Sequence, residues 1–264
     1  MDILLVLGYL LAFLVGVTLG LVGSGGSILT VPILVYLMGL DAVTATGYSL
    51  FIVGVAAAVG GVRNMQKGNA DLKAVVLFGL PSMVMAYLMR AFLLPMVPQD
   101  LTIFDVFQIT KPQLLLILFA LVMLMASYRM INPGNTQKGK GSASPAKVAL
   151  SGLATGAVAG AVGAGGGFLI IPALVFLAKL SMKRAVGTSL VIIAVQSLAG
   201  FAGDALGSDP DWNFLALFTA IAVAGIFLGI ALAKKIRGEA LKTGFGYFIL
   251  AMGLYIIVQE VLIN

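Results

Sequence analysis

The sequence predicts an all-α integral membrane protein with two inverted-topology repeats. Each repeat has about five apolar segments, including one short broken or re-entrant helix. Three observations predict this fold class: the composition, an internal repeat and the distribution of charge. Of the 264 residues, 61% are hydrophobic and 10% charged, with a mean hydropathy of +1.11. A soluble protein normally has about a quarter charged residues, and the apolar runs lack the alternation of a membrane β-barrel, so spanning helices are expected.

An internal repeat divides the chain. The stretch GLVGSGGSILTVP, from Gly20 to Pro32, returns 140 residues later as GAVGAGGGFLIIP, from Gly160 to Pro172. The correspondence continues without a gap to Leu50 and Leu190. A duplication of this length in so apolar a chain indicates two copies of one membrane unit that face each other.

Each repeat has the same order of apolar segments: long, short, long, long and long. The ten segments are Ile3–Val22, Ser27–Leu40, Ala42–Val62, Ala74–Leu94, Leu114–Ile131, Val148–Val162, Phe168–Leu180, Ala185–Ala202, Phe214–Ala233 and Leu241–Leu262. At 1.5 Å per residue the short ones reach about 20 Å, less than the roughly 30 Å of the hydrocarbon core. We therefore expect a first repeat over residues 1–131, a cytoplasmic linker over 132–147 and a second repeat over 148–264.

Basic residues gather at four connections between the apolar segments. These connections hold 14 of the 16 basic residues: Arg63, Lys67, Lys73, Arg129, Lys138, Lys140, Lys147, Lys179, Lys183, Arg184, Lys234, Lys235, Arg237 and Lys242. The positive-inside rule places them in the cytoplasm and both termini outside. The first repeat then begins outside and the second inside, so the copies have opposite topology. Many secondary transporters have this architecture, with the substrate at the repeat interface.

The residue types that the chain lacks exclude several classes of site. Without cysteine or histidine, thiol redox chemistry, disulfides and imidazole proton shuttles are excluded. A metal site made of carboxylates alone stays open, but no apolar segment carries two acids at a metal-ligand spacing, so neither a metal ion nor a cofactor is expected. The first apolar stretch lacks the basic start and the cleavage site of a signal peptide, and we interpret it as a retained helix.

The glycine turns of the repeat form the candidate substrate site. Each clustered glycine costs a helix up to about 1 kcal/mol relative to alanine, but suits a turn with positive φ and exposed N–H groups. Each turn leads into the N-terminus of a short helix, which favours an anion. Two such ends together would form a positively polarised pocket for a small oxyanion. In contrast, the spacing of four in Gly16, Gly20, Gly152, Gly156 and Gly160 is typical of close helix packing.

The candidate substrate-binding residues are turn glycines, turn serines and polar residues of the following helices. They are Gly23, Ser24, Gly25, Gly26, Ser27, Ser49, Gly163, Gly165, Gly166, Gly167, Ser189 and Gln196. Ser49 and Ser189 rank above other hydroxyls because both copies keep them, whereas most hydroxyls in membrane helices bond their own backbone. For Gln196, packing and substrate binding both stay open. Arg90, near the external end of its helix, can snorkel or attract anions to an outer vestibule.

The two copies of a G-x-x-G-x-G-G-[SG] turn, each followed by a proline-containing short helix and a G-x-S-L segment, resemble the TauE/SafE family of membrane transporters. The resemblance covers essentially the whole chain. It assigns the family's turns to Gly23, Gly25 and Gly26 with Pro32, and to Gly163, Gly165 and Gly166 with Pro172. It implies a protein of the bacterial inner membrane that exports sulfite or moves related organosulfur anions such as sulfonates.

We therefore expect a secondary transporter, and more specifically an exporter, of a small sulfur-containing anion, with alternating access at the repeat interface and helix breaks held by Pro32 and Pro172. The expected partners are a small anionic substrate and the lipid bilayer, without nucleic acid; a homo-oligomer stays open. An inside-negative potential drives anions outward by about 2.3 kcal/mol per charge per 100 mV, which favours export. A passive anion channel is the alternative. A membrane-embedded enzyme is a weaker one, because no nucleophile with a base is found.

Overall fold

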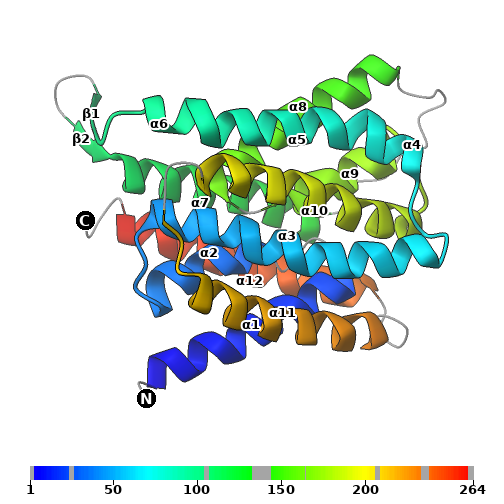
Figure 1. Ribbon diagram of the computed structural model, residues 1–264, viewed down its shortest axis with the longest axis horizontal. Coiled ribbons are helices and arrows are strands. Elements are labelled where there is room, and N and C mark those ends of the chain that lie inside the picture. The colour runs from blue at the N-terminus through cyan, green and yellow to red at the C-terminus, as the bar shows by residue number, and fades with distance from the viewer. Residues whose placement is uncertain are drawn as a thin grey trace.

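The computed structural model describes residues 3–23, 27–103, 107–132, 144–163, 165–205, 209–232 and 238–260, and within them the chain is almost entirely helical (Figure 1). The α-helices are α1 (Ile3–Val22), α2 (Ser27–Pro32), α3 (Ala42–Gln66), α4 (Leu72–Ala74), α5 (Leu80–Leu88), α6 (Leu94–Met96), α7 (Lys111–Ile131), α8 (Pro145–Val162), α9 (Gly167–Phe176), α10 (Met182–Ala205), α11 (Trp212–Leu232) and α12 (Gly238–Val258). The π-helical turns are η1 (Ile33–Leu37), η2 (Val75–Gly79) and η3 (Met89–Leu93), and two short antiparallel strands, β1 (Asp100–Ile103) and β2 (Phe107–Thr110), precede α7. The helical fold class is confirmed.

Several of these helices have the length and composition of membrane spans. In the described residues there are six: Ala42–Gln66, Leu72–Met96, Lys111–Tyr128, Pro145–Val162, Lys183–Ala205 and Trp212–Leu232. The second of them joins α4, η2, α5, η3 and α6, which follow one another without a gap. Large apolar side chains such as Leu10, Leu150 and Phe227 are exposed on the outside of the bundle, as expected for a surface that lipid covers. The chain is a multi-pass membrane protein.

Both halves of the chain have the predicted order of helices: long, short, long, long and long. In the first half α1 precedes a short helix made of α2 and η1, and in the second half α8 precedes α9. At 1.5 Å per residue both short helices are about 16 Å long, half of the roughly 30 Å core. The glycines that follow α1 and α8, Gly23 and Gly163, are buried. The breaks between each long helix and the short helix that follows it thus lie at buried glycines.

The prolines do not break the short helices, which corrects one prediction. Helical structure continues across Pro32 from α2 into η1, and α9 runs without interruption through Pro172. Proline lacks a backbone N–H. It therefore loses one helical bond, yet the helix continues in both halves; after Pro32 the bonding has the π pattern, with Met38 N donating to Ile33 O at 3.1 Å. The helix breaks lie at the preceding glycines instead.

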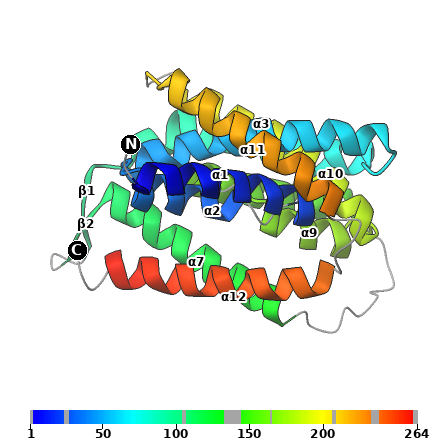
Figure 2. The ribbon, with the colours of Figure 1, turned by 90° about the horizontal axis from the view of Figure 1, so that it is seen from below.

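The two halves pack on each other, and a contact from a residue of the first half to one of the second recurs between the equivalent residues of the opposite halves. In Figure 1 and Figure 2, α3 lies against α10 and α7 against α12. The Ala222 carbonyl of α11 covers Gly16 of α1, and the Ser82 carbonyl of α5 covers Gly156 of α8. Positions 16 and 156 are 140 residues apart, and so are positions 82 and 222. These two contacts are therefore equivalent, with the two copies in exchanged roles.

The bundle has two distinct ends (Figure 1). At the end that we call the terminal end, α1 begins, α12 ends and the two strands lie. At the opposite end, which we call the basic end, α3 ends and α4, α8 and α10 begin, with Arg63, Lys73, Lys147 and Arg184 in or beside these helix ends. An ion pair of 3.0 Å between Asp71 and Arg184 joins the start of α4 to the start of α10 at the basic end.

Gly156→Leu is expected to destabilise the protein, because the new side chain would overlap the Ser82 carbonyl that now covers this glycine. Over-packing of this kind typically costs about 1–3 kcal/mol. The matched control is Ala154→Leu, which places a leucine at an exposed position of the same helix. Thermal unfolding in detergent should give a lower melting temperature for Gly156→Leu alone. Equal melting temperatures would contradict the close packing of α8 on α5.

Candidate functional site

The glycine turns have the left-handed backbone that their sequence predicts. Gly163 ends α8 with a φ of 75°, and Gly165 and Gly166 each have a φ of 62°. In the first turn Gly23 has a φ of 78°. Gly167, in contrast, is already the first residue of α9. The other three predicted residues of the first turn, Ser24, Gly25 and Gly26, lie outside the described residues.

Each turn is covered by a helix of the other half. A Cβ at Gly23 would lie 2.6 Å from Cγ1 of Val186 on α10, and a Cβ at Gly163 would lie 2.6 Å from Cα of Thr46 on α3. Positions 23 and 163, like positions 46 and 186, are 140 residues apart. Because the interior is close-packed, a side chain at either glycine would push the halves apart.

Polar side chains surround the second turn. The amide of Gln196 on α10 donates to the Gly165 carbonyl, and Oε1 of Gln196 accepts from the Ser82 hydroxyl of α5. Ser82, Gln196 and Ser197 are fully buried. The Ser197 hydroxyl lies beside Gly165 and has no hydrogen-bond partner among the described residues. In this conformation Gln196 ties the turn to α5, while Ser197 keeps a donor that a ligand can use.

The serines that both copies keep differ in their hydrogen bonds. Ser189 of α10 donates to Val186 O at 2.9 Å and reaches Gly23 O of the first turn at 3.5 Å. Ser49, its equivalent on α3, is fully buried, and its hydroxyl has no partner within the described part of the chain. Ser27 is buried as the first residue of α2. The structure thus brings Ser189 to a glycine turn and leaves the hydroxyl of Ser49 with unused capacity.

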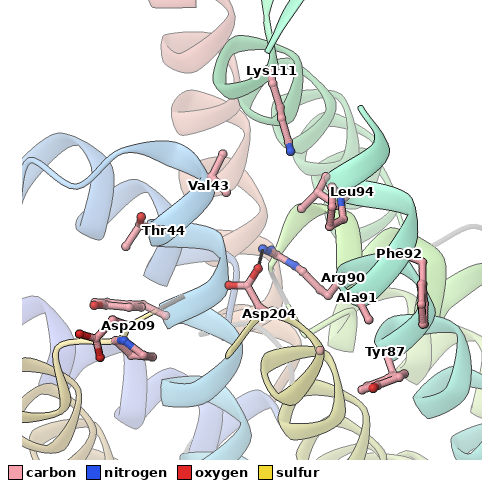
Figure 3. A pocket seen from close by; sticks show the side chains of 14 residues that line it. Val43, Thr44, Tyr87, Arg90, Ala91, Phe92, Leu94, Lys111, Asp204 and Asp209 are labelled. Atoms are coloured by element: carbon pink, nitrogen blue, oxygen red, sulfur yellow. Dashed lines mark hydrogen bonds and ion pairs between the residues drawn. The ribbon is translucent and has the colours of Figure 1, made fainter. Parts of the chain in front are cut away.

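A cavity of about 600 Å³ lies at the terminal end of the bundle (Figure 3). Its wall combines the start of α3, the helix from α5 to α6, the start of α7 and the end of α10. The described turn glycines, Gly23, Gly163, Gly165 and Gly166, are not among the residues that line it. Thr46, which covers Gly163, lies between Thr44 and Tyr48, and both of these do line it. The cavity therefore lies on the terminal side of the second glycine turn.

Arg90 is buried in the wall of this cavity. It lies on η3, a π turn of the kind that recurs at functional sites, and it is only 1% exposed. Its Nε donates to the Gly160 carbonyl of α8 at 2.6 Å, and its Nη1 lies 3.5 Å from Oδ1 of Asp204. Nη2 has no hydrogen-bond partner among the described residues. Arg90 thus does not snorkel outward but points into the cavity (Figure 3).

The distribution of basic residues along the sequence contains a signal for this cavity. Two basic residues remain outside the four basic connections, Arg90 and Lys111, and both line the cavity. Lys111 is not among the candidate substrate-binding residues that the sequence indicates. In the structure it is buried, with 7% of its surface exposed. Ser82 and Ser197 were not selected either, because a hydroxyl in an apolar segment usually bonds its own helix. Tertiary contacts distinguish them: Ser82 meets Gln196 of the other half, and Ser197 lies beside Gly165 of its own half.

The donors at the second turn and in the cavity suit an anion better than a metal ion. Guanidinium, ammonium and hydroxyl groups, together with the N-terminus of α9, donate hydrogen bonds to oxygen atoms. Within the described residues, no three acidic side chains come together in a group that could hold a metal ion.

Comparison with known proteins shows the family of the chain. The family model described as "Sulfite exporter TauE/SafE" matches residues 8–256. A "Probable membrane transporter protein" of Xylella fastidiosa (strain 9a5c) is 30% identical over 258 residues, which cover 92% of this chain and 91% of the relative. Similar proteins of Methanocaldococcus jannaschii and Bacillus subtilis are 27% and 24% identical, over 97% and 89% of this chain and 96% and 92% of the relatives. No solved structure matches. The chain therefore belongs to the TauE/SafE sulfite exporter family of membrane transporters.

Proposed function

We propose that the chain is a secondary transporter that exports a small sulfur-containing anion, such as sulfite or an organosulfonate, by alternating access between its two halves. The observation that carries the proposal is the reciprocal cover of the glycine turns, Gly23 by Val186 and Gly163 by Thr46. Because each break in the helical path lies at a contact between the halves, movement of one half against the other changes the surroundings of both breaks.

The surroundings of the second turn support an anionic substrate. The first N–H groups of α9 have no partner within their own helix, and the positive end of the helix dipole lies there. Ser197 adds a buried hydroxyl without a partner among the described residues. An ionised sulfur oxyanion presents several acceptor oxygens and no donor, so a cluster of donors is complementary to it.

We also propose that the halves are inverted in a bacterial inner membrane, with the basic end in the cytoplasm and both termini outside. Helices α1 and α8 run in opposite directions between the two ends of the bundle (Figure 1), and the basic residues near helix ends support the orientation. In this orientation an inside-negative potential drives an anion outward, by about 2.3 kcal/mol per charge per 100 mV, without a coupled ion.

Single cysteines test the inverted topology directly, because the chain has none of its own. Gln66, at the end of α3, and Asp209, after α10, are exposed and lie in equivalent connections of the two halves. In intact cells an impermeant maleimide should label Asp209→Cys and should label Gln66→Cys only after permeabilisation. Parallel repeats would instead place both cysteines on the same side of the membrane.

Substrate counterflow in proteoliposomes tests the transport mechanism. Vesicles loaded with unlabelled sulfite and diluted into a trace of ³⁵S-sulfite should accumulate the label transiently. An alternating-access carrier that has released unlabelled sulfite outside binds labelled sulfite there and carries it inward. Empty liposomes are the control for leakage. A passive channel would equilibrate the label without a transient maximum, and no uptake of sulfite or of a sulfonate would reject the proposed substrate class.

Gly166→Ala is expected to reduce counterflow by about tenfold, because the new Cβ disturbs the second turn and about 1.4 kcal/mol corresponds to a factor of ten. That Cβ would lie 3.0 Å from Nε2 of Gln196. The left-handed backbone adds a strain of about 1–2 kcal/mol, which the control below shares. Gly68→Ala is the matched control, with a similar φ of 68° and nothing within 4 Å of the added atom. Variants should be compared at equal amounts of inserted protein. Equal loss in both would assign the effect to backbone strain alone.

A further inference from the structure

The terminal-end cavity holds charges that the site at the glycine turns does not use. Arg90 and Lys111 are 1% and 7% exposed, and Figure 3 shows the Lys111 ammonium directed from α7 toward Arg90 and Asp204. Buried cations require compensating negative charge, because an uncompensated charge in a medium of low dielectric constant is strongly unfavourable. The Asp204 carboxylate supplies part of this charge, and Asp209, the other acid of the lining, is exposed to solvent. The cavity can therefore take up a further anion next to the two cations.

The contact between Arg90 and Asp204 is long for an ion pair. Its 3.5 Å compares with about 2.7–2.9 Å for a tight charge-assisted bond. The side chain of Asp204 is 22% exposed while that of Arg90 is fully buried, so the carboxylate has access to water and the guanidinium does not. Nη2 has no partner within the described residues. An oxyanion that replaces Asp204 at Nη1 could therefore bind Nη1 and Nη2 together through two parallel N–H bonds.

The equivalent positions at the other end of the bundle are uncharged. The repeat equivalents of Arg90 and Asp204 are Ile230 and Asn64. The equivalence of positions 64 and 204 also holds in space, because each of these side chains lies against the corresponding glycine of the other half. The arrangement of helices is thus shared by the two ends, while this charge pair belongs to the terminal end.

We propose that Arg90 and Lys111 form an oxyanion-binding site in the terminal-end cavity, and that Asp204 is its internal competitor. Asp204 pairs with Arg90 while the cavity is empty, and the incoming anion replaces Asp204 as the partner of Arg90. The class of ligand, a sulfur oxyanion, rests on the proposed function. A transport path has to bind its ion strongly enough for entry and weakly enough for release. A competing carboxylate meets the second requirement, because it replaces the departing anion.

Calorimetric titration of the purified protein with sulfite tests the competitor. The buffer should be Tris, because common alternatives such as HEPES are sulfonates and would occupy the site. Asp204→Asn should bind sulfite about tenfold more tightly than wild type, since Arg90 no longer has to be freed. The control is Asp71→Asn, which also removes an acid paired with an arginine but lies at the basic end. Its dissociation constant should equal that of wild type.

Arginine variants test whether the competition acts through Arg90. Arg90→Lys keeps the charge and loses the fork of N–H groups, so it should bind sulfite about tenfold more weakly. The double variant Arg90→Gln/Asp204→Asn leaves neither charge of the pair and should bind as weakly as Arg90→Gln alone. If Asp204→Asn strengthened binding by the same factor in the absence of Arg90, a general electrostatic effect would replace the proposed exchange.

Binding and counterflow together separate this site from the transport function. Sulfite counterflow in wild type, with dissociation constants unchanged in Arg90→Lys and Asp204→Asn, would overturn the cavity site and leave the proposed function standing. Weaker binding in Asp204→Asn would overturn the competitor role. If wild type shows neither counterflow nor binding of sulfite or taurine, both proposals are wrong.

Discussion

Backbone that leaves a helix inside an apolar bundle has to find its hydrogen-bond partners in protein, because lipid offers none. In this chain the other half provides the cover, with Val186 over Gly23 and Thr46 over Gly163. Glycines on α1 and α8, such as Gly16, allow the helices of the other half to approach closely enough. The halves therefore protect each other's breaks, and exposure of either turn requires them to move relative to each other.

The two turns are not protected in the same way, although the frame around them is duplicated. At the second turn Gln196 binds the Gly165 carbonyl and the Ser82 hydroxyl, which forms a chain of polar groups from α10 to α5. The equivalents of Gln196 and Ser82 in the other copy are Ala56 and Ala222, which cannot form such a chain. Polar partners are worth more where water is excluded, so these two side-chain bonds strengthen the hold on the second turn, and the alanines of the other copy cannot form them.

Local properties of the sequence were enough to predict the order of helices, the short helix in each half and the positive φ of Gly23, Gly163, Gly165 and Gly166, but not the helical Gly167. Hydropathy and glycine clusters act over a few residues, so they need no tertiary context. Continuous helix through Pro32 could not be predicted, because proline removes a helical bond and the packing around it decides whether the helix continues. The bond from Arg90 to the Gly160 carbonyl joins segments 70 residues apart. Contacts between segments so far apart cannot be predicted from a local pattern, and the same holds for the bonds of Gln196 to Ser82 and to the Gly165 carbonyl.

The close packing that covers the turns also places the buried cation. A Cβ at Gly160 would lie 2.9 Å from the Ala86 carbonyl, so only glycine lets α8 come this close and offer its own carbonyl to Arg90. That carbonyl lies near the C-terminus of α8, where the negative end of the helix dipole stabilises a cation. Arg90 is thus held on one side by backbone that stays in place and on the other by Asp204, which can turn to water. Such a guanidinium can exchange one partner and keep its position. Because its equivalent in the other copy is Ile230, the two ends of the duplicated bundle differ chemically.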